Sequence, residues 1–195
     1  MSAPIALRSA ARASLARGFT MIEALVVLSI TAVLLAIVIP SFQSAFLSNK
    51  LASYANAWIA AVHLARGEAV KRNLPTVLCR SSDGDTCASG GTWQAGWIVC
   101  VDADKNGSCA ASETKVWKQE SLSSDYHFTP NCLIATCSGT GYALTFQPAG
   151  INPDLAQWKL ILCRATPSAG GQERELTVKA TGSTNVATTK NGSCA

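Results

Sequence analysis

The sequence predicts an α+β protein in which one long N-terminal helix packs against an antiparallel β-sheet domain. Two observations indicate this. An apolar run over residues 19–39 continues into a segment with apolar residues at helical spacing. The second half of the chain instead has short β-like runs separated by clusters of Gly, Pro, Ser and Asp. We therefore expect a leader over 1–18, a helix over 19–72 and a β-rich, disulfide-stabilised globular domain over 73–195.

The chain of 195 residues has room for one domain and an appendage. Charged residues make up only 14% against a usual ~25%, which argues against charge-driven disorder. The net charge of +4 is concentrated near the N-terminus, where Arg8, Arg12 and Arg17 have no acidic neighbour. The remainder carries 13 basic and 12 acidic residues. This balance excludes a strongly basic nucleic-acid-binding domain.

The run from Phe19 to Ile39 contains one charged residue, Glu23. As a helix it would span roughly 32 Å, enough to cross a bilayer. A cleaved secretory signal has a shorter apolar core and a small-residue cleavage site, and no such site follows Pro40. A simple membrane anchor would leave Glu23 unexplained, because a carboxylate in hydrocarbon is costly and usually has a partner.

The segment Gly18-Phe19-Thr20-Met21-Ile22-Glu23, the apolar run and Pro40 together resemble the N-termini of type IV pilins and type II secretion pseudopilins. The resemblance implies that a prepilin peptidase cuts between Gly18 and Phe19 and that the new amino terminus of Phe19 is methylated. It implies that Glu23 docks each subunit against the amino terminus of a neighbour, which suits a charge that is tolerated in low dielectric only when paired. Pro40 lies where such helices kink, because proline removes a backbone hydrogen bond.

The helical pattern resumes after Pro40 and predicts one apolar face for packing on the globular domain. His63 falls outside this face and is expected to point to solvent, and Asn73 and Pro75 should end the helix near residue 72. The residues of the face are Leu51, Tyr54, Ala55, Trp58, Val62, Ala65 and Ala69.

Short β-rich runs predict strands that form an antiparallel sheet over the helix. The residues Trp93, Ala95, Trp97, Val99 and Val101 alternate along one run, so we expect them on one face of a strand. The expected strands are Thr76–Arg80, Thr92–Val101, Thr114–Glu120, Tyr142–Gln147, Gln157–Arg164 and Arg174–Ala180.

Eight cysteines occur, and no two have the C-x-x-C spacing that zinc ribbons and thioredoxin-type redox pairs usually need. An even number in an exported chain predicts structural disulfides. The simplest arrangement joins nearest neighbours, although other pairings remain open. It gives Cys79–Cys87, Cys100–Cys109, Cys132–Cys137 and Cys163–Cys194.

The second half also resembles the GspH/FimT-like minor pilins, through Gly96-Trp97-Ile98-Val99, the loop Asp102–Gly107, and the runs Trp158–Arg164 and Arg174–Gly182. This implies a structural or priming subunit of a type IV pilus or pilus-tip complex. A GspH-type secretion pseudopilin and a DNA-binding pilin for natural transformation are the alternatives. DNA-binding members use arginines in a G-R-x-R segment. The corresponding Gly182-Ser183-Thr184-Asn185 has none, so DNA is a disfavoured partner.

The loop after Val101 matches the spacing of an EF-hand calcium loop, with Asp102, Asp104, Asn106, Gly107 and Glu113 in the expected order. An EF-hand needs flanking helices, whereas this loop is expected to join two strands. Asp, Asn and Gly also favour hairpin turns. We therefore expect a turn without a metal, and calcium is the alternative.

Catalytic motifs are missing from the sequence. The two histidines, His63 and His127, do not occur in a recognisable catalytic pattern, and Gly139-Thr-Gly141 is a turn signal without the third glycine of a dinucleotide site. We expect a non-enzyme without cofactor. Its partners would be other pilin and minor pilin subunits, the prepilin peptidase and the inner membrane. It would lie in the inner membrane before assembly, and in a periplasmic or extracellular pilus afterwards.

Overall fold

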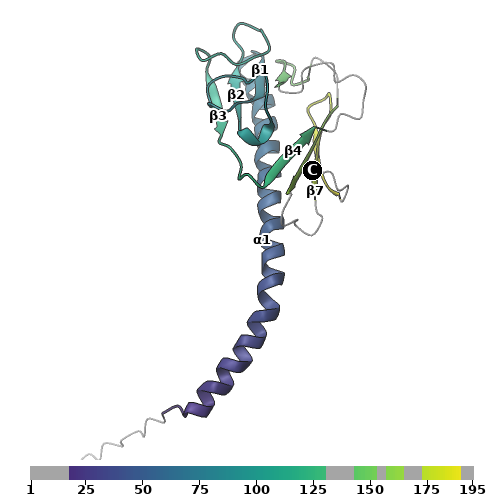
Figure 1. Ribbon diagram of the computed structural model, residues 1–195. Helices are drawn as coiled ribbons and strands as arrows, with labels where there is room; N and C mark the ends of the chain where they lie inside the picture. Colours follow the sequence, from purple (N-terminus) through teal and green to yellow (C-terminus); the bar gives the residue numbers. More distant parts are fainter. Residues whose placement is uncertain (1–17, 131–142, 153–156, 165–172, 190–195) are drawn as a thin grey trace, which may run out of the picture. The chain divides into compact units, whose positions relative to one another are not determined.

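The computed structural model describes residues 18–130, 143–152, 157–164 and 173–189 (Figure 1). The chain divides into two compact units, Met1–Ser41 and Phe42–Ala195. The helix α1 (Met21–Arg72) crosses the boundary between them, and the elements that follow it in the described ranges are strands and one short 3₁₀ helix. The expected α+β class is confirmed.

Local sequence signals set both ends of α1. The Glu23 backbone N–H donates to the Thr20 hydroxyl oxygen (3.3 Å), so Thr20 caps the first turn, and the acidic Glu23 suits the positive end of the helix dipole. Lys71 and Arg72 lie in the last turn. Asn73 then adopts a left-handed backbone (φ 55°), which ends the helix as its sequence predicts.

The strands of the described ranges form two four-stranded antiparallel sheets rather than the single sheet expected. Sheet A has the order β3-β2-β1-β5 and sheet B the order β4-β6-β7-β8. The bounds of sheet A are β1 (Thr76–Arg80), β2 (Trp97–Val101), β3 (Lys115–Gln119) and β5 (Ala143–Phe146). Those of sheet B are β4 (Tyr126–Pro130), β6 (Trp158–Arg164), β7 (Glu173–Val178) and β8 (Thr184–Thr189).

The expected strand over Thr92–Val101 is wrong in its first half. A 3₁₀ helix, η1 (Trp93–Ala95), occupies that part, so Trp93 and Trp97 do not share a strand face. Gly96 separates the two elements at φ 118°, which residues with a side chain rarely adopt. A Cβ there would lie 2.6 Å from the Gln119 carbonyl oxygen and 2.9 Å from that of Ser81. The chain therefore bends where the alternation suggested a straight strand.

Two strands were not expected from the sequence. β4 carries a histidine and a proline, and β8 is a Thr- and Asn-containing run with little apolar character. Both are edge strands of sheet B, and such short runs with few aliphatic residues give a weak strand signal in the sequence. Each acquires its register from its neighbour instead, as in the pairing of Phe128 with Leu162 and of Val186 with Leu176.

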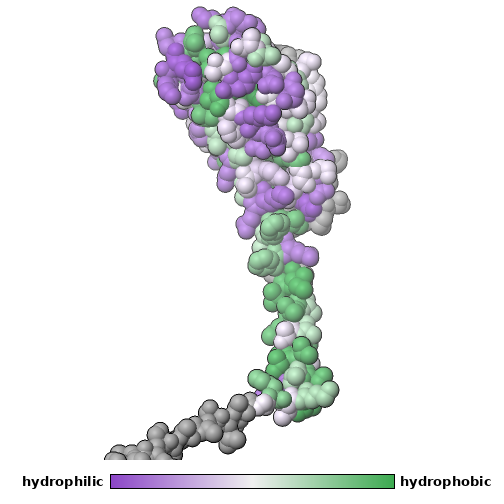
Figure 2. Space-filling model, turned by 90° about the vertical axis from the view of Figure 1, so that its left-hand side faces the viewer, coloured by the Kyte–Doolittle hydropathy of each residue, from purple (hydrophilic) through white to green (hydrophobic). Residues whose placement is uncertain are grey.

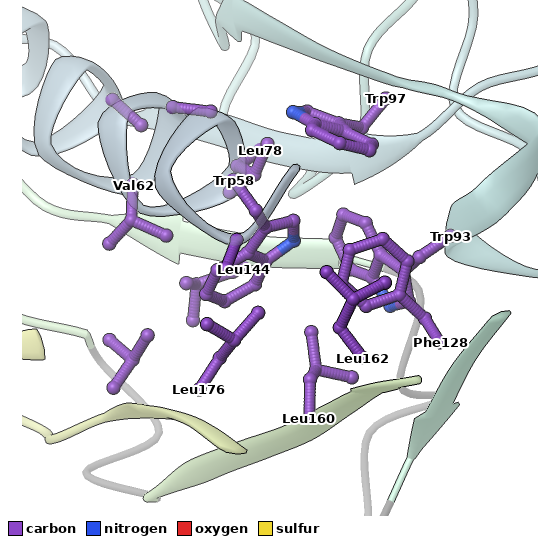
Figure 3. Close-up of a cluster of buried hydrophobic side chains, with 14 of the residues drawn as sticks. Trp58, Val62, Leu78, Trp93, Trp97, Phe128, Leu144, Leu160, Leu162 and Leu176 are labelled. Carbon is purple, nitrogen blue, oxygen red and sulfur yellow. The ribbon is translucent and has the colours of Figure 1, made fainter. Parts of the chain in front are cut away.

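The main core of the globular unit lies between the C-terminal part of α1 and the two sheets. Figure 3 shows Trp58 extending from α1 toward Trp93 and the leucines of sheet B. Trp58 and Trp93 meet edge to face with ring centroids 5.8 Å apart, and Trp97 meets Phe128 in the same way at 5.9 Å. The apolar face predicted for the helix is buried here, except that Tyr54 is half-buried, and His63 is exposed as predicted.

Arg66 of α1 joins turns from both sheets. Its Nε donates to the Gly150 carbonyl oxygen (2.9 Å) in the turn after β5 of sheet A. A Cβ on Gly182, in the turn between β7 and β8 of sheet B, would lie 2.8 Å from Arg66 Cδ. The two turns also bond to each other, because the Asn152 N–H donates to the Ala180 carbonyl oxygen (3.0 Å). The sheets are therefore held together at the end of α1.

Candidate functional site

The N-terminal stretch of α1 presents apolar side chains to its surroundings on every side of the helix. Phe19 is 83% exposed, and the large apolar residues between Met21 and Ile39 are all at least about half exposed. Figure 2 shows these residues in green along the helix. By length and composition α1 is able to cross a membrane, with a mean hydropathy of 2.8 in its most apolar window. A helix that is apolar all round requires lipid or other protein around it.

Glu23 stands out on this surface. Two other polar side chains are already satisfied within the helix, since the Ser29 hydroxyl donates to the Val26 carbonyl oxygen (2.8 Å) and the Thr31 hydroxyl to that of Val27 (2.7 Å). The Glu23 carboxylate has no ion pair within the described part of the chain. In an apolar environment it needs a cation that the described part of the chain does not supply.

The peptide bond between Gly18 and Phe19 lies just before the helix begins. Both residues are exposed and non-helical, and no heavy atom beyond the chain neighbours of Gly18 lies within 4 Å of a Cβ built there. The bond is therefore exposed and outside the helix, and its cleavage stays a prediction. Pro40 lies within α1, and its side chain is outside the described part. The kink at Pro40 stays a prediction.

The acidic loop between β2 and β3 brings three carboxylates together. Oxygens of Asp102, Asp104 and Glu113 all lie within 4.8 Å of one another. Asp102 is only 1% exposed. Burial raises its pKa, and Asp104 and Glu113 nearby act in the same direction. These are the residue types that the calcium alternative requires, in a loop that joins two antiparallel strands as the turn interpretation requires.

Backbone N–H groups already occupy the oxygens of this loop. Asp102 accepts from Asn106 (3.0 Å) and Gly107 (2.9 Å) through its two separate oxygens. Glu113 likewise accepts from Ala103 (2.8 Å) and Ala110 (3.0 Å). These bonds compensate the carboxylates and fix the turn without requiring an ion.

We therefore expect calorimetry of the folded chain with calcium to show no saturable heat at micromolar metal. The ground is that the loop joins two strands rather than the two helices of an EF-hand, and that its carboxylates already have backbone N–H partners. The matched variant is Asp104→Ala, which removes one potential ligand and leaves Asp102 and Glu113 in place. A one-site isotherm that this substitution abolishes would contradict the prediction and identify a calcium loop.

Two of the expected disulfides are present, Cys79–Cys87 and Cys100–Cys109. Both cover the face of sheet A that is turned away from the main core, where they form a small second cluster with Val77 and Ile98. Cys163 is also disulfide-bonded. The pairings Cys132–Cys137 and Cys163–Cys194 involve residues outside the described ranges and stay predictions.

The C-terminal strands do not gather free cations in the part of the chain that the structure describes. Lys159 pairs with Glu175 (2.8 Å), and Arg164 pairs with Asp125 (2.9 Å). Arg174 donates to the Ser48 hydroxyl (3.2 Å). The segment 182–185 forms the turn and first residues of β8, where the hydroxyl group of Thr184 lies 2.9 Å from His63 Nε2. This arrangement gives a polyanion no convergent set of positive charges.

Comparison with known proteins supports a single family. The family model described as type II transport protein GspH matches residues 54–182, and that of the prokaryotic N-terminal methylation motif matches residues 14–39. The search of curated proteins found no match.

Two crystal structures of one protein share the fold. The type IV minor pilin FimU of Pseudomonas aeruginosa is 20% identical, with a TM-score of 0.53 over 72% of this chain and 90% of that one. A second crystal form of FimU, also 20% identical, has a TM-score of 0.51 over 70% of this chain and 92% of that one. The minor pseudopilin EpsH of Vibrio cholerae is 12% identical, with a TM-score of 0.44 over 71% and 96%.

Proposed function

This chain belongs to the GspH family of type IV pilins and pseudopilins, and on that premise we propose that it is a minor pilin of a type IV pilus or pilus-tip complex. Proteins of this kind work within assemblies of other pilins. The single observation that carries the proposal is the exposed apolar surface of the N-terminal part of α1, interrupted by the Glu23 carboxylate, which has no ion pair among the described residues. That surface suits a membrane first and a bundle of similar helices afterwards.

Assembly would depend on the negative charge of the Glu23 carboxylate. In the membrane, the exposed apolar residues keep the precursor anchored. Cleavage before Phe19 would create an ammonium group four residues from Glu23 in the chain. In a bundle of parallel helices, the carboxylate of one subunit can then meet the amino terminus of its neighbour, and each compensates the other in low dielectric. The pairing fixes the axial position of one subunit against the next.

One prediction from this proposal concerns processing. We expect protein recovered from host membranes to begin at Phe19, because the bond after Gly18 is exposed and precedes the helix. N-terminal sequencing measures this directly, and mass spectrometry of the same sample should show a methylated Phe19. The matched variant is Gly18→Val, whose bulk should leave the leader attached. A mature protein that begins at another residue would contradict the assignment.

Deletion of the gene in the native host tests whether the protein belongs to a pilus or to a secretion system. We expect fewer surface pili with type II secretion unchanged, and complementation by the intact gene should restore the pili. The alternative is a GspH-type pseudopilin, which the description of the matching family favours. Loss of secretion with normal piliation would support that alternative and reject the pilus.

A further inference from the structure

The two disulfides on the outer face of sheet A lie next to each other. The Sγ atoms of Cys79, Cys87 and Cys109 are all within 4.8 Å of one another, although Cys109 belongs to the second bridge. The backbone holds the two loop cysteines together, because the Cys87 N–H donates to the Cys109 carbonyl oxygen (3.1 Å). The Cys109 N–H in turn donates to Cys87 Sγ (2.9 Å). Three sulfurs from two bridges therefore form one cluster.

The four cysteines of the two bridges differ in how far they are buried. Cys79 and Cys100 are fully buried and Cys109 is 3% exposed, whereas Cys87 is only half-buried. A thiolate opens a disulfide by attacking one of its sulfurs, and the rate depends on whether that sulfur is accessible. Cys87 is therefore the residue of the cluster most open to an external thiol, and the bridge between Cys100 and Cys109 is shielded from direct attack.

We propose that Cys87 is the site at which a thiol–disulfide oxidoreductase acts on this protein, and that the buried bridge Cys100–Cys109 is opened only by relay through Cys79. The relay product is a bridge between Cys79 and Cys109. The partner is defined by its chemistry as a dithiol protein that forms a transient mixed disulfide with Cys87.

The exchange balances in three steps. A thiolate of the dithiol bonds to Cys87 Sγ, and Cys79 leaves with the electron pair as a thiolate. That thiolate attacks Cys109 Sγ, forming the Cys79–Cys109 bond, while Cys100 leaves as a thiolate and takes a proton from water. The second thiol of the dithiol then attacks its own mixed-disulfide sulfur and releases Cys87. The dithiol is oxidised to a disulfide, and the protein gains two thiols.

A hydrogen bond at Cys87 favours the third step, in which Cys87 is released. When Cys87 leaves, its negative charge forms on the sulfur that already accepts the Cys109 N–H. A hydrogen bond to the thiolate stabilises it, so Cys87 leaves the mixed disulfide more readily than a thiolate without such a bond would. The exchange can also run in the opposite direction during oxidative folding. A Cys79–Cys109 bridge that forms first would then need an isomerase to reach the native pairing.

The test follows partial reduction of the full chain in detergent with dithiothreitol at mildly alkaline pH, with alkylation at time points and peptide mapping by mass spectrometry. We expect a species with a Cys79–Cys109 bridge and alkylated Cys87 and Cys100 to accumulate before complete reduction. Independent reduction of the two bridges, with no such species at any time point, would overturn the proposal.

Paired variants supply the second measurement. Replacing Cys79 and Cys87 together with serine should slow reduction of Cys100–Cys109 by about tenfold or more, because the relay is lost and direct access is poor. The matched control replaces Cys100 and Cys109 together with serine, and the rate for Cys79–Cys87 should not change. Faster or unchanged opening of Cys100–Cys109 in the first variant would reject the relay. If either variant fails to fold, the trapped species in the natural chain decides alone.

Discussion

Replacing Glu23 with glutamine will reduce incorporation of the protein into its assembly by more than about tenfold, while anchoring in the membrane is retained. The neighbour's amino terminus would be left charged and unpaired in low dielectric, which costs about 3–5 kcal/mol. Each 1.4 kcal/mol corresponds to roughly a tenfold change in an equilibrium. The measurement is the ratio of assembled to membrane-bound protein, by immunoblot of sheared filaments and membranes.

The matched control for Glu23 is Ser29→Ala. Ser29 lies in the same exposed apolar run, but its hydroxyl is already bonded to the Val26 carbonyl oxygen, so it needs no partner from a second chain. Incorporation of this variant should equal that of the natural protein. Equal incorporation of Glu23→Gln would show that the carboxylate does not pair with an amino terminus, and would remove the docking step from the proposed function.

The second large effect is expected at Trp58. Its replacement with alanine should lower the free energy of unfolding of the globular unit by about 3–5 kcal/mol, the usual cost of truncating a large buried aromatic residue. Trp58 is fully buried and packs against Trp93. Denaturant unfolding of a fragment that begins at Phe42, with the disulfides kept oxidised, measures the change.

Trp117 provides the control for this measurement. It lies on β3, only half-buried, at the margin of the same core. Its replacement with alanine should cost clearly less than that of Trp58, because less apolar area returns to water. If Trp58→Ala lowers the free energy of unfolding by less than about 1 kcal/mol, α1 does not form part of the folded core.

Strong local signals made much of the helix and its exposed apolar surface predictable from the sequence. The apolar run, the lone Glu23 and the stop at Asn73 each depend on short-range chemistry that sequence order records directly. The same holds for β1, whose bounds match the prediction, and for two cysteine pairings that close short loops. Neighbours in sequence become neighbours in space when a single turn joins them.

Only the tertiary structure decided the rest. Trp93 has the spacing of a strand residue, yet the close approach of Gly96 to two carbonyl oxygens bends the chain there. β8 has almost no apolar pattern and becomes a strand because β7 offers it a hydrogen-bonding edge. The contact of Cys109 with the other disulfide is likewise not recorded in spacing. Sequence alone therefore determined the long helix, the single carboxylate in its apolar run and the α+β class, because these depend on residues close together in the chain. The division into two sheets and the three-sulfur cluster depend on contacts between distant segments, which form only when the chain folds.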